Sequence, residues 1–186
     1  DAGDGFLAKL DMAGGKLLYS TYVGGSAFDE VKKLVIEPSG RIAAAGYTLS
    51  PNFPTTSNAA QPAYGGNSDA FLMIIDPQQT DFTKALIYST FFGGSDGEVP
   101  YDLRRDTAGR YYLCGYTLSA DLRTTSGAIA SSTGGQSIDG FVAGIDPRVS
   151  GSSALFYGSY VTSPGYQIVQ NIDVDRDGYL YVGGLS

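Results

Sequence analysis

The chain has 186 residues, a length that suits one domain, with 26 glycines, one cysteine and no histidine. Its formal net charge of −7 disfavours a nucleic-acid partner, and the lack of histidine excludes Ser-His-Asp catalysis and histidine-ligated zinc. A single cysteine excludes an intrachain disulfide, and no apolar run is long enough for a membrane-spanning helix. The composition therefore predicts a folded, turn-rich protein with no membrane span.

Short runs of β-branched, aromatic and aliphatic residues, bounded by Gly, Pro, Asp and Ser, predict strands. In chain order the first runs are 6–10, 17–23, 31–36 and 41–48, and the series continues with 71–75 and 86–92. Glycine-containing segments between neighbouring runs predict hairpin turns. No helical periodicity recurs, so we expect helix only in the longer connections, for example at 57–64.

The pattern repeats every 69 residues. Two sets of residues keep this interval: Tyr19, Tyr88 and Tyr157, and Gly46, Gly115 and Gly184. A third landmark, Asp-Gly-Phe or Asp-Ala-Phe, begins at residues 4, 69 and 139. Four strands per repeat are typical of β-propeller blades, in which four-stranded antiparallel sheets pack face to face around an axis. A two-sheet sandwich is the alternative.

With strands labelled A to D from the inner edge of a blade outward, the chain reads C-D, A-B-C-D, A-B-C-D, A-B. We therefore predict an all-β fold of two complete and two half blades, about three blade-equivalents in an incomplete ring. The expected boundaries are 4–28, 29–97, 98–163 and 164–186. Because sheet edges would stay unpaired, we expect the chain to be part of a longer polypeptide or of an oligomeric ring, such as two chains supplying six blades.

Several of these segments resemble one known family. They are Leu-Tyr-Ser-Thr-Tyr followed by Gly-Gly-Ser at 18–26, Asp-Ala-Phe at 69–71 leading to Asp-Pro at 76–77, the strand-turn-strand at 34–48 and Asn-Phe-Pro-Thr-Thr at 52–56. Together they resemble the bacterial SBBP repeat, which is named for a seven-bladed β-propeller. The resemblance implies a secreted or cell-surface bacterial protein, and it carries over no established catalytic residue. The third copy departs from the pattern, because Thr-Ser-Pro at 162–164 replaces Gly-Gly-Ser.

The expected function is a non-catalytic structural or binding segment with its long loops on one face. Antiparallel geometry places the B-to-C connections, 49–68 and 118–138, on the same face as the D-to-A turns. Loops of this length in a compact domain are usually functional or mobile, so this face is the expected contact surface for a protein or a glycan. The acidic residues that we expect on it are Asp29, Glu30, Asp96, Glu98 and Asp102. Solvation of exposed loops by these residues is the alternative interpretation.

Two other functions remain open at this stage. A propeller hydrolase or lyase acting on glycans would need paired carboxylates, such as Asp29 with Asp96. Nothing in the sequence selects a pair, so we predict neither a catalytic residue nor a required cofactor.

The second is a calcium-stabilised adhesion module. Asp173, Asp175 and Asp177 precede Gly178 with the spacing that opens a Ca²⁺ loop. An Asp-Gly hairpin explains the same motif without an ion. Cys114, in a predicted strand, is expected to be a buried thiol.

Overall fold

The computed structural model describes residues 3–13, 15–135 and 138–186. Within these residues it contains twelve strands and two short helices. The strands are β1 Gly5–Leu10, β2 Leu17–Val23, β3 Asp29–Ile36, β4 Ile42–Thr48, β5 Asp69–Ile75, β6 Leu86–Phe92, β7 Glu98–Arg105, β8 Tyr111–Thr117, β9 Asp139–Ile145, β10 Leu155–Val161, β11 Ile168–Val174 and β12 Leu180–Leu185. No helix of the described part is long and apolar enough to cross a membrane.

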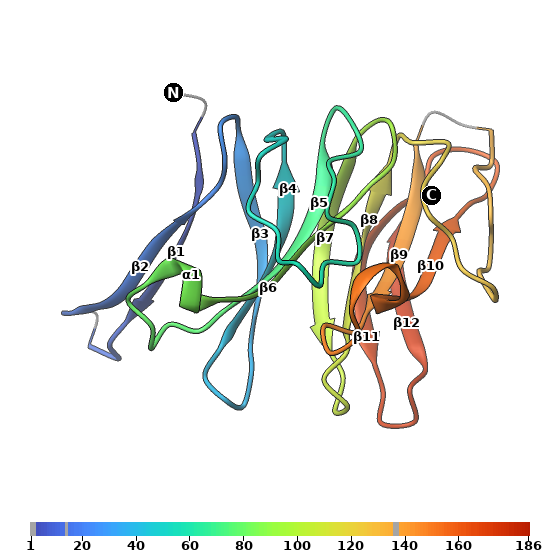
Figure 1. Ribbon diagram of the computed structural model, residues 1–186. Helices are drawn as coiled ribbons and strands as arrows, with labels where there is room; N and C mark the ends of the chain where they lie inside the picture. Colours follow the sequence, from blue (N-terminus) through green and yellow to red (C-terminus); the bar gives the residue numbers. More distant parts are fainter. Residues whose placement is uncertain (1–2, 14, 136–137) are drawn as a thin grey trace.

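The strands form four antiparallel sheets. Their strand orders are β1-β2, β3-β4-β5-β6, β7-β8-β9-β10 and β11-β12, so within each sheet the strands follow one another in chain order. Figure 1 shows the sheets side by side in chain order, with β1 and β2 at one end of the molecule and β11 and β12 near the other. The prediction of an all-β chain with antiparallel sheets of two to four strands is therefore confirmed.

The hydrophobic core lies between consecutive sheets. Every residue of β5 and of β9 is buried, because both faces of these strands are covered by neighbouring sheets. Their sequences are correspondingly apolar on both faces rather than alternating. Each junction between sheets has its own cluster, represented by the pairs Leu7 and Phe71, Leu72 and Leu103, and Tyr112 and Ile172.

The turns between the first two strands of each four-strand unit share one backbone requirement. Gly40, Gly109 and Gly178 occupy the same turn position, with φ angles of 85°, 90° and 89°. Only glycine adopts this left-handed region at little cost, so the 69-residue glycine interval follows from the turn geometry. β3, β7 and β11 also share a register shift two to three residues from their starts, and in β7 this shift accommodates Pro100 in an edge strand.

The two helices lie in the β5–β6 and β9–β10 connections. They are α1 Phe82–Ala85 and a 3-10 helix, Gly151–Ala154. The expectation of a helix at 57–64 is wrong. That segment runs along β6, and its backbone groups form hydrogen bonds with residues of β6 and not with one another. Ala60 N–H donates to the Tyr88 hydroxyl (3.3 Å), and Gln61 N–H donates to Thr90 Oγ1 (2.8 Å).

The loop that joins β8 to β9 repeats this arrangement along β10. Thr125 N–H donates to the Gly158 carbonyl, and Tyr160 N–H donates to the Ala130 carbonyl, both at 3.0 Å. The middle of each long loop therefore covers the outer edge of its own sheet, which would otherwise present unpaired backbone groups.

Candidate functional site

The candidate site is the face where the long loops meet the turns that enter β3, β7 and β11. The first residue of β3 is Asp29 and that of β7 is Glu98, and Gln167 directly precedes β11. These three residues are 69 apart and all are buried. Each side chain accepts a hydrogen bond from a backbone N–H four residues earlier: Gly25 (2.8 Å), Gly94 (2.9 Å) and Ser163 (2.9 Å).

A Thr-Leu-Ser sequence at the start of each long loop completes this network. Ser119 N–H donates to Thr117 Oγ1 (3.0 Å), which places the serine hydroxyl at the neighbouring turn. Ser119 Oγ then accepts from Asp96 N–H (2.8 Å), while Thr117 Oγ1 donates to Glu98 Oε1 (2.6 Å). The preceding unit repeats the serine contacts, since Ser50 Oγ donates to Asp29 Oδ2 and accepts from Ala27 N–H, both at 2.8 Å.

A second buried carboxylate, Asp69, holds the end of the first long loop. Its oxygens accept from Gly65 N–H (2.9 Å), Gly66 N–H (3.3 Å) and Gln61 Nε2 (2.9 Å). Gln61 Oε1 in turn accepts from Gly93 N–H (3.1 Å). The end of the loop is thus fixed to the turn between β6 and β7, whereas its start is fixed at Ser50 to the turn between β2 and β3.

Gly93 lies between the two carboxylates. A Cβ atom at Gly93 would be 2.5 Å from the carboxyl carbon of Asp69 and 2.5 Å from Glu98 Oε2. Gly24 has the same place between Asp4 and Asp29, with carboxylate oxygens of both at 2.7 Å from such an atom. The first glycine of the Gly-Gly pair after β2 and after β6 is therefore required by the close approach of two acidic side chains.

Burial sets the electrostatics of the Asp69–Glu98 pair. Burial raises the pKa of Asp69 to about 6, although the backbone N–H groups of Gly65 and Gly66 oppose the shift. Burial also raises the pKa of Glu98 to about 7, and the negative charge of Asp69 adds to the rise. Two like charges this close disfavour full ionisation, so the pair retains part of a proton near neutral pH.

The third copy of the network has a neutral form of the same arrangement. Gln167 stands where Glu98 stands in the second copy, and its Oε1 accepts the equivalent backbone hydrogen bond. Its Nε2 donates to Ser163 Oγ (2.6 Å). Thr162 replaces the intervening glycine, and the opposing acid is Asp139. An amide has the shape of a protonated carboxyl group, so this copy keeps the hydrogen bonds without the second charge.

The five acidic residues predicted for an exposed face do not form one. Asp29 and Glu98 are buried anchors of the turns, so the expectation of exposure is wrong for both. Glu30 forms an ion pair with Lys32 (2.9 Å), and Asp96 accepts from Asn67 Nδ2 (2.9 Å). The sequence could not show that backbone N–H groups and the hydroxyls of Ser50 and Thr117 donate to these two buried carboxylates.

Asp102 lies inside β7, away from the loops, and its predicted exposure is also wrong. Its carboxylate meets Lys33 Nζ (3.0 Å), Arg104 Nη1 (2.7 Å) and Ile172 N–H (3.1 Å) from three different sheets. Burial raises the pKa of Asp102, but these contacts outweigh it, and the pKa lies below its ordinary value. Asp102 therefore joins sheets and is not part of a contact surface.

The predicted calcium motif lies at the β11–β12 turn. Asp175 accepts from the N–H groups of Asp177 and Tyr179 and from the Tyr181 hydroxyl, each at 2.9 Å. Asp173 accepts from Val174 N–H and lies 3.7 Å from Arg104 Nε. Within the described residues, no three acidic or cysteine side chains group as metal ligands would. The hydrogen bonds that Asp175 accepts within the turn explain the presence of this carboxylate without a metal ion.

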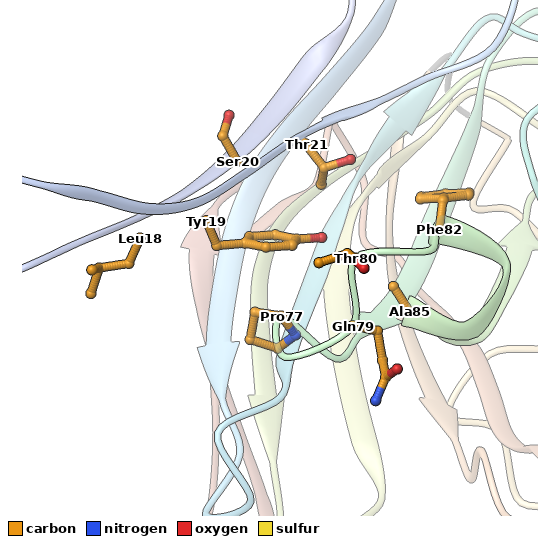
Figure 2. A pocket seen from close by; sticks show the side chains of 9 residues that line it. All are labelled: Leu18, Tyr19, Ser20, Thr21, Pro77, Gln79, Thr80, Phe82 and Ala85. Atoms are coloured by element: carbon orange, nitrogen blue, oxygen red, sulfur yellow. The ribbon is translucent and has the colours of Figure 1, made fainter.

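A cavity of about 280 Å³ lies between β2 and the connection that holds α1 (Figure 2). The ring of Tyr19 extends from β2 toward Pro77 and Thr80. A related cavity of about 240 Å³, lined by Tyr88 and Pro147, occurs at the next junction between sheets. Because the feature recurs with the repeat, we interpret it as a product of the packing between sheets.

Sequence reasoning missed Asp69, Ser50, Ser119 and Gln61 as anchors of the loops. The 69-residue interval of the Thr-Leu-Ser sequence was the available signal. Comparison with known proteins adds no assignment, since no protein-family model and no curated protein matches the chain.

Proposed function

We propose that the chain is a segment of a β-propeller in which each four-stranded sheet is one blade. Three features support this proposal. The first strands of successive units, β3, β7 and β11, pack side by side, and the sheets contact one another in chain order. The core is divided into one cluster per junction, as in stacked blades. The strand order within each four-stranded sheet follows the chain without a crossover.

We further propose that the segment is a non-catalytic binding scaffold of a secreted or cell-surface bacterial protein. The observation that carries this proposal is the fixation of both long loops by buried side chains. Loops held in one conformation lose little entropy when they bind a protein or a glycan. The loop segments 62–68 and 131–135 are exposed or half-buried, so such a partner could reach them.

A binding screen with a matched pair of variants tests the scaffold. The unmodified protein is applied to immobilised bacterial-surface glycans and to extracellular matrix proteins. Ile129→Asp changes an exposed residue of the second loop, and Met12→Asp changes an exposed residue of the β1–β2 turn. We expect at least a tenfold loss of affinity for Ile129→Asp only. Equal binding by both variants, or turnover of a bound glycan, would contradict the proposal.

A further inference from the structure

A contact between phenylalanine and glycine recurs in the two complete sheets. Gly46 of β4 pairs with Phe71 of β5, and Gly115 of β8 pairs with Phe141 of β9. The rings lie 2.8 and 2.9 Å from where a Cβ atom on these glycines would be, so only glycine admits them. Each phenylalanine is fully buried by this contact and by the adjoining sheet.

The first and last sheets each contain half of the same contact. Phe6 of β1 is the counterpart of Phe71, but it is 67% exposed. Gly184 of β12 is the counterpart of Gly46. The carbonyl oxygen of Ile168 lies close to Gly184 in the way that the carbonyl oxygen of Glu30 lies close to Gly46. Gly184 lines an open groove of about 200 Å³ together with Val169 and Val182. Phe6 therefore has no glycine opposite its ring, and Gly184 has no aromatic ring opposite it. The two residues lie at opposite ends of the molecule.

The space beside β1 has the form of a missing strand pair. β7 packs on β3, β4 and β5, and β11 packs on β7, β8 and β9, whereas β3 packs on β1 and β2. Leu34 of β3 is consequently 45% exposed, while its counterparts Leu103 and Ile172 are 0% and 1% exposed. A groove of about 680 Å³ opens between β1 and β3 at this position. The β1–β2 sheet lacks the first two strands of a four-strand unit at this place. The β11–β12 hairpin consists of two such strands.

We propose that a second copy of this chain inserts its β11–β12 hairpin into the groove, with its β12 antiparallel to β1 and its Gly184 under Phe6. The register follows from the β4–β5 and β8–β9 pairings. It pairs Leu10 with Leu180, Ala8 with Val182, and Phe6 with Gly184 of the second copy. This proposal rests on the blade architecture of the proposed function and adds the partner, the strands and the register.

The remaining exposed apolar side chains fit the same assembly. Tyr22 of β2 is 78% exposed, whereas its counterparts Phe91 and Tyr160 are 1% and 0% exposed. Phe91 faces the preceding sheet, in a cluster with Leu7 and Val23. In the assembly, Tyr22 would face the β7–β10 sheet of the second copy in the same way.

The charges also agree with this partner. The hairpin brings Asp173, Asp175 and Asp177, with Arg176, toward an adjoining cavity beside β1 that Lys9 lines. The contact is heterologous, so it must close into a ring or continue as a fibre.

Cysteine cross-linking tests the register. Ala8→Cys on one copy and Val182→Cys on another, both with Cys114→Ala, are mixed under mild oxidation. Directly opposed residues on paired strands lie within disulfide range. We expect this pair to form a mixed dimer at least tenfold faster than Leu10→Cys with Val182→Cys, which is displaced by two residues. Equal rates, or no mixed dimer, would overturn the proposal.

The mass in solution tests the assembly itself. Sedimentation at tens of micromolar should give at least twice the chain mass of 19.5 kDa. Phe6→Asp should weaken association at least tenfold. Leu18→Asp, a comparably exposed change at the cavity between β2 and the α1 connection, should not. A single-chain mass for the unmodified protein would overturn the second-copy proposal. The scaffold proposal would still be tested by the binding of the Ile129→Asp and Met12→Asp variants, because neither substitution changes β1 or β12.

Discussion

At the scale of single residues, the loop face depends on carboxylates that are buried and not solvated. Asp69 and Glu98 use their oxygens to accept hydrogen bonds from the ends of a turn and a loop. A charged carboxylate that accepts such bonds holds the backbone firmly, but burial beside a second acid makes its ionisation unfavourable. The third copy avoids this conflict with Gln167, which suggests a direct substitution at Glu98.

Glu98→Gln should change how stability depends on pH. The pKa of Glu98 is raised from an ordinary 4.5 to about 7, so the folded state binds a proton that the unfolded state has released. The free energy of unfolding therefore falls as pH rises from about 4.5 to 7. At ~1.4 kcal/mol per pKa unit, this fall is on the order of 3 kcal/mol.

Urea unfolding at pH 5 and pH 8 measures this effect. We expect the unmodified protein to lose about 2–3 kcal/mol more between these pH values than Glu98→Gln loses. Asp69 contributes at lower pH in both proteins, since its pKa is about 6. Glu30→Gln, on a half-exposed side chain, is the control and should keep the slope of the unmodified protein. Parallel stability curves for all three proteins would contradict this account.

Gly93→Ala should destabilise the protein, because the added Cβ would overlap both carboxylates. The expected loss is about 1–3 kcal/mol, as for other overpacked sites. Gly183→Ala is the matched control, since nothing lies within 4 Å of its added Cβ and Ala45 occupies the equivalent place. Thermal unfolding compares the two variants. An equal midpoint for both would show that Gly93 is not confined by the acids.

At the scale of elements, each long loop has two functions that the structure separates. The middle of the loop follows the outer strand of its sheet and forms hydrogen bonds with the backbone groups of that edge strand. The start of the loop fixes the turn that enters the same sheet, through the Thr-Leu-Ser sequence, and the exposed residues of the loop remain available for contact. The loops are thus parts of the sheets as much as candidate binding segments.

Ser119→Ala should release the turn between β6 and β7. The substitution removes the acceptor for Asp96 N–H, and a hydrogen-bond donor left without its partner away from water costs about 1–3 kcal/mol. We expect the Asp96 amide to exchange its hydrogen at least tenfold faster, while amides of β4 keep their rates. Ser126→Ala, on an exposed serine of the same loop, should change neither. Unchanged exchange at Asp96 in Ser119→Ala would contradict the anchoring role.

Strand positions could be predicted from the sequence because apolar runs and glycine turns are local signals. The first strand of each unit is the exception. β3 begins at Asp29 and not at the predicted residue 31, because a charged residue at a strand start has no strand signal of its own.

The burial of Asp102 was unpredictable for a different reason. Its partners Lys33 and Ile172 are 69 and 70 residues away, and only the packing of three sheets brings them together.

At the scale of the whole molecule, one pattern of exposure distinguishes the ends from the middle. The counterparts of Phe6 and Tyr22 are buried wherever another sheet precedes theirs, and those of Leu34 are buried wherever that preceding sheet has four strands. The same sequence positions are therefore core or surface positions according to the neighbouring sheet. This regularity supports an account in which blades stack around an axis and the two half sheets complete each other.

A crystal structure of the assembled protein tests this account most directly. We predict four-stranded sheets around one axis, with β3, β7 and β11 of both copies next to it. In this assembly, β12 of one copy pairs with β1 of the other, and Phe6 covers Gly184. An assembly in which the sheets form two opposed layers, or in which β1 and β12 remain unpaired, would contradict the account.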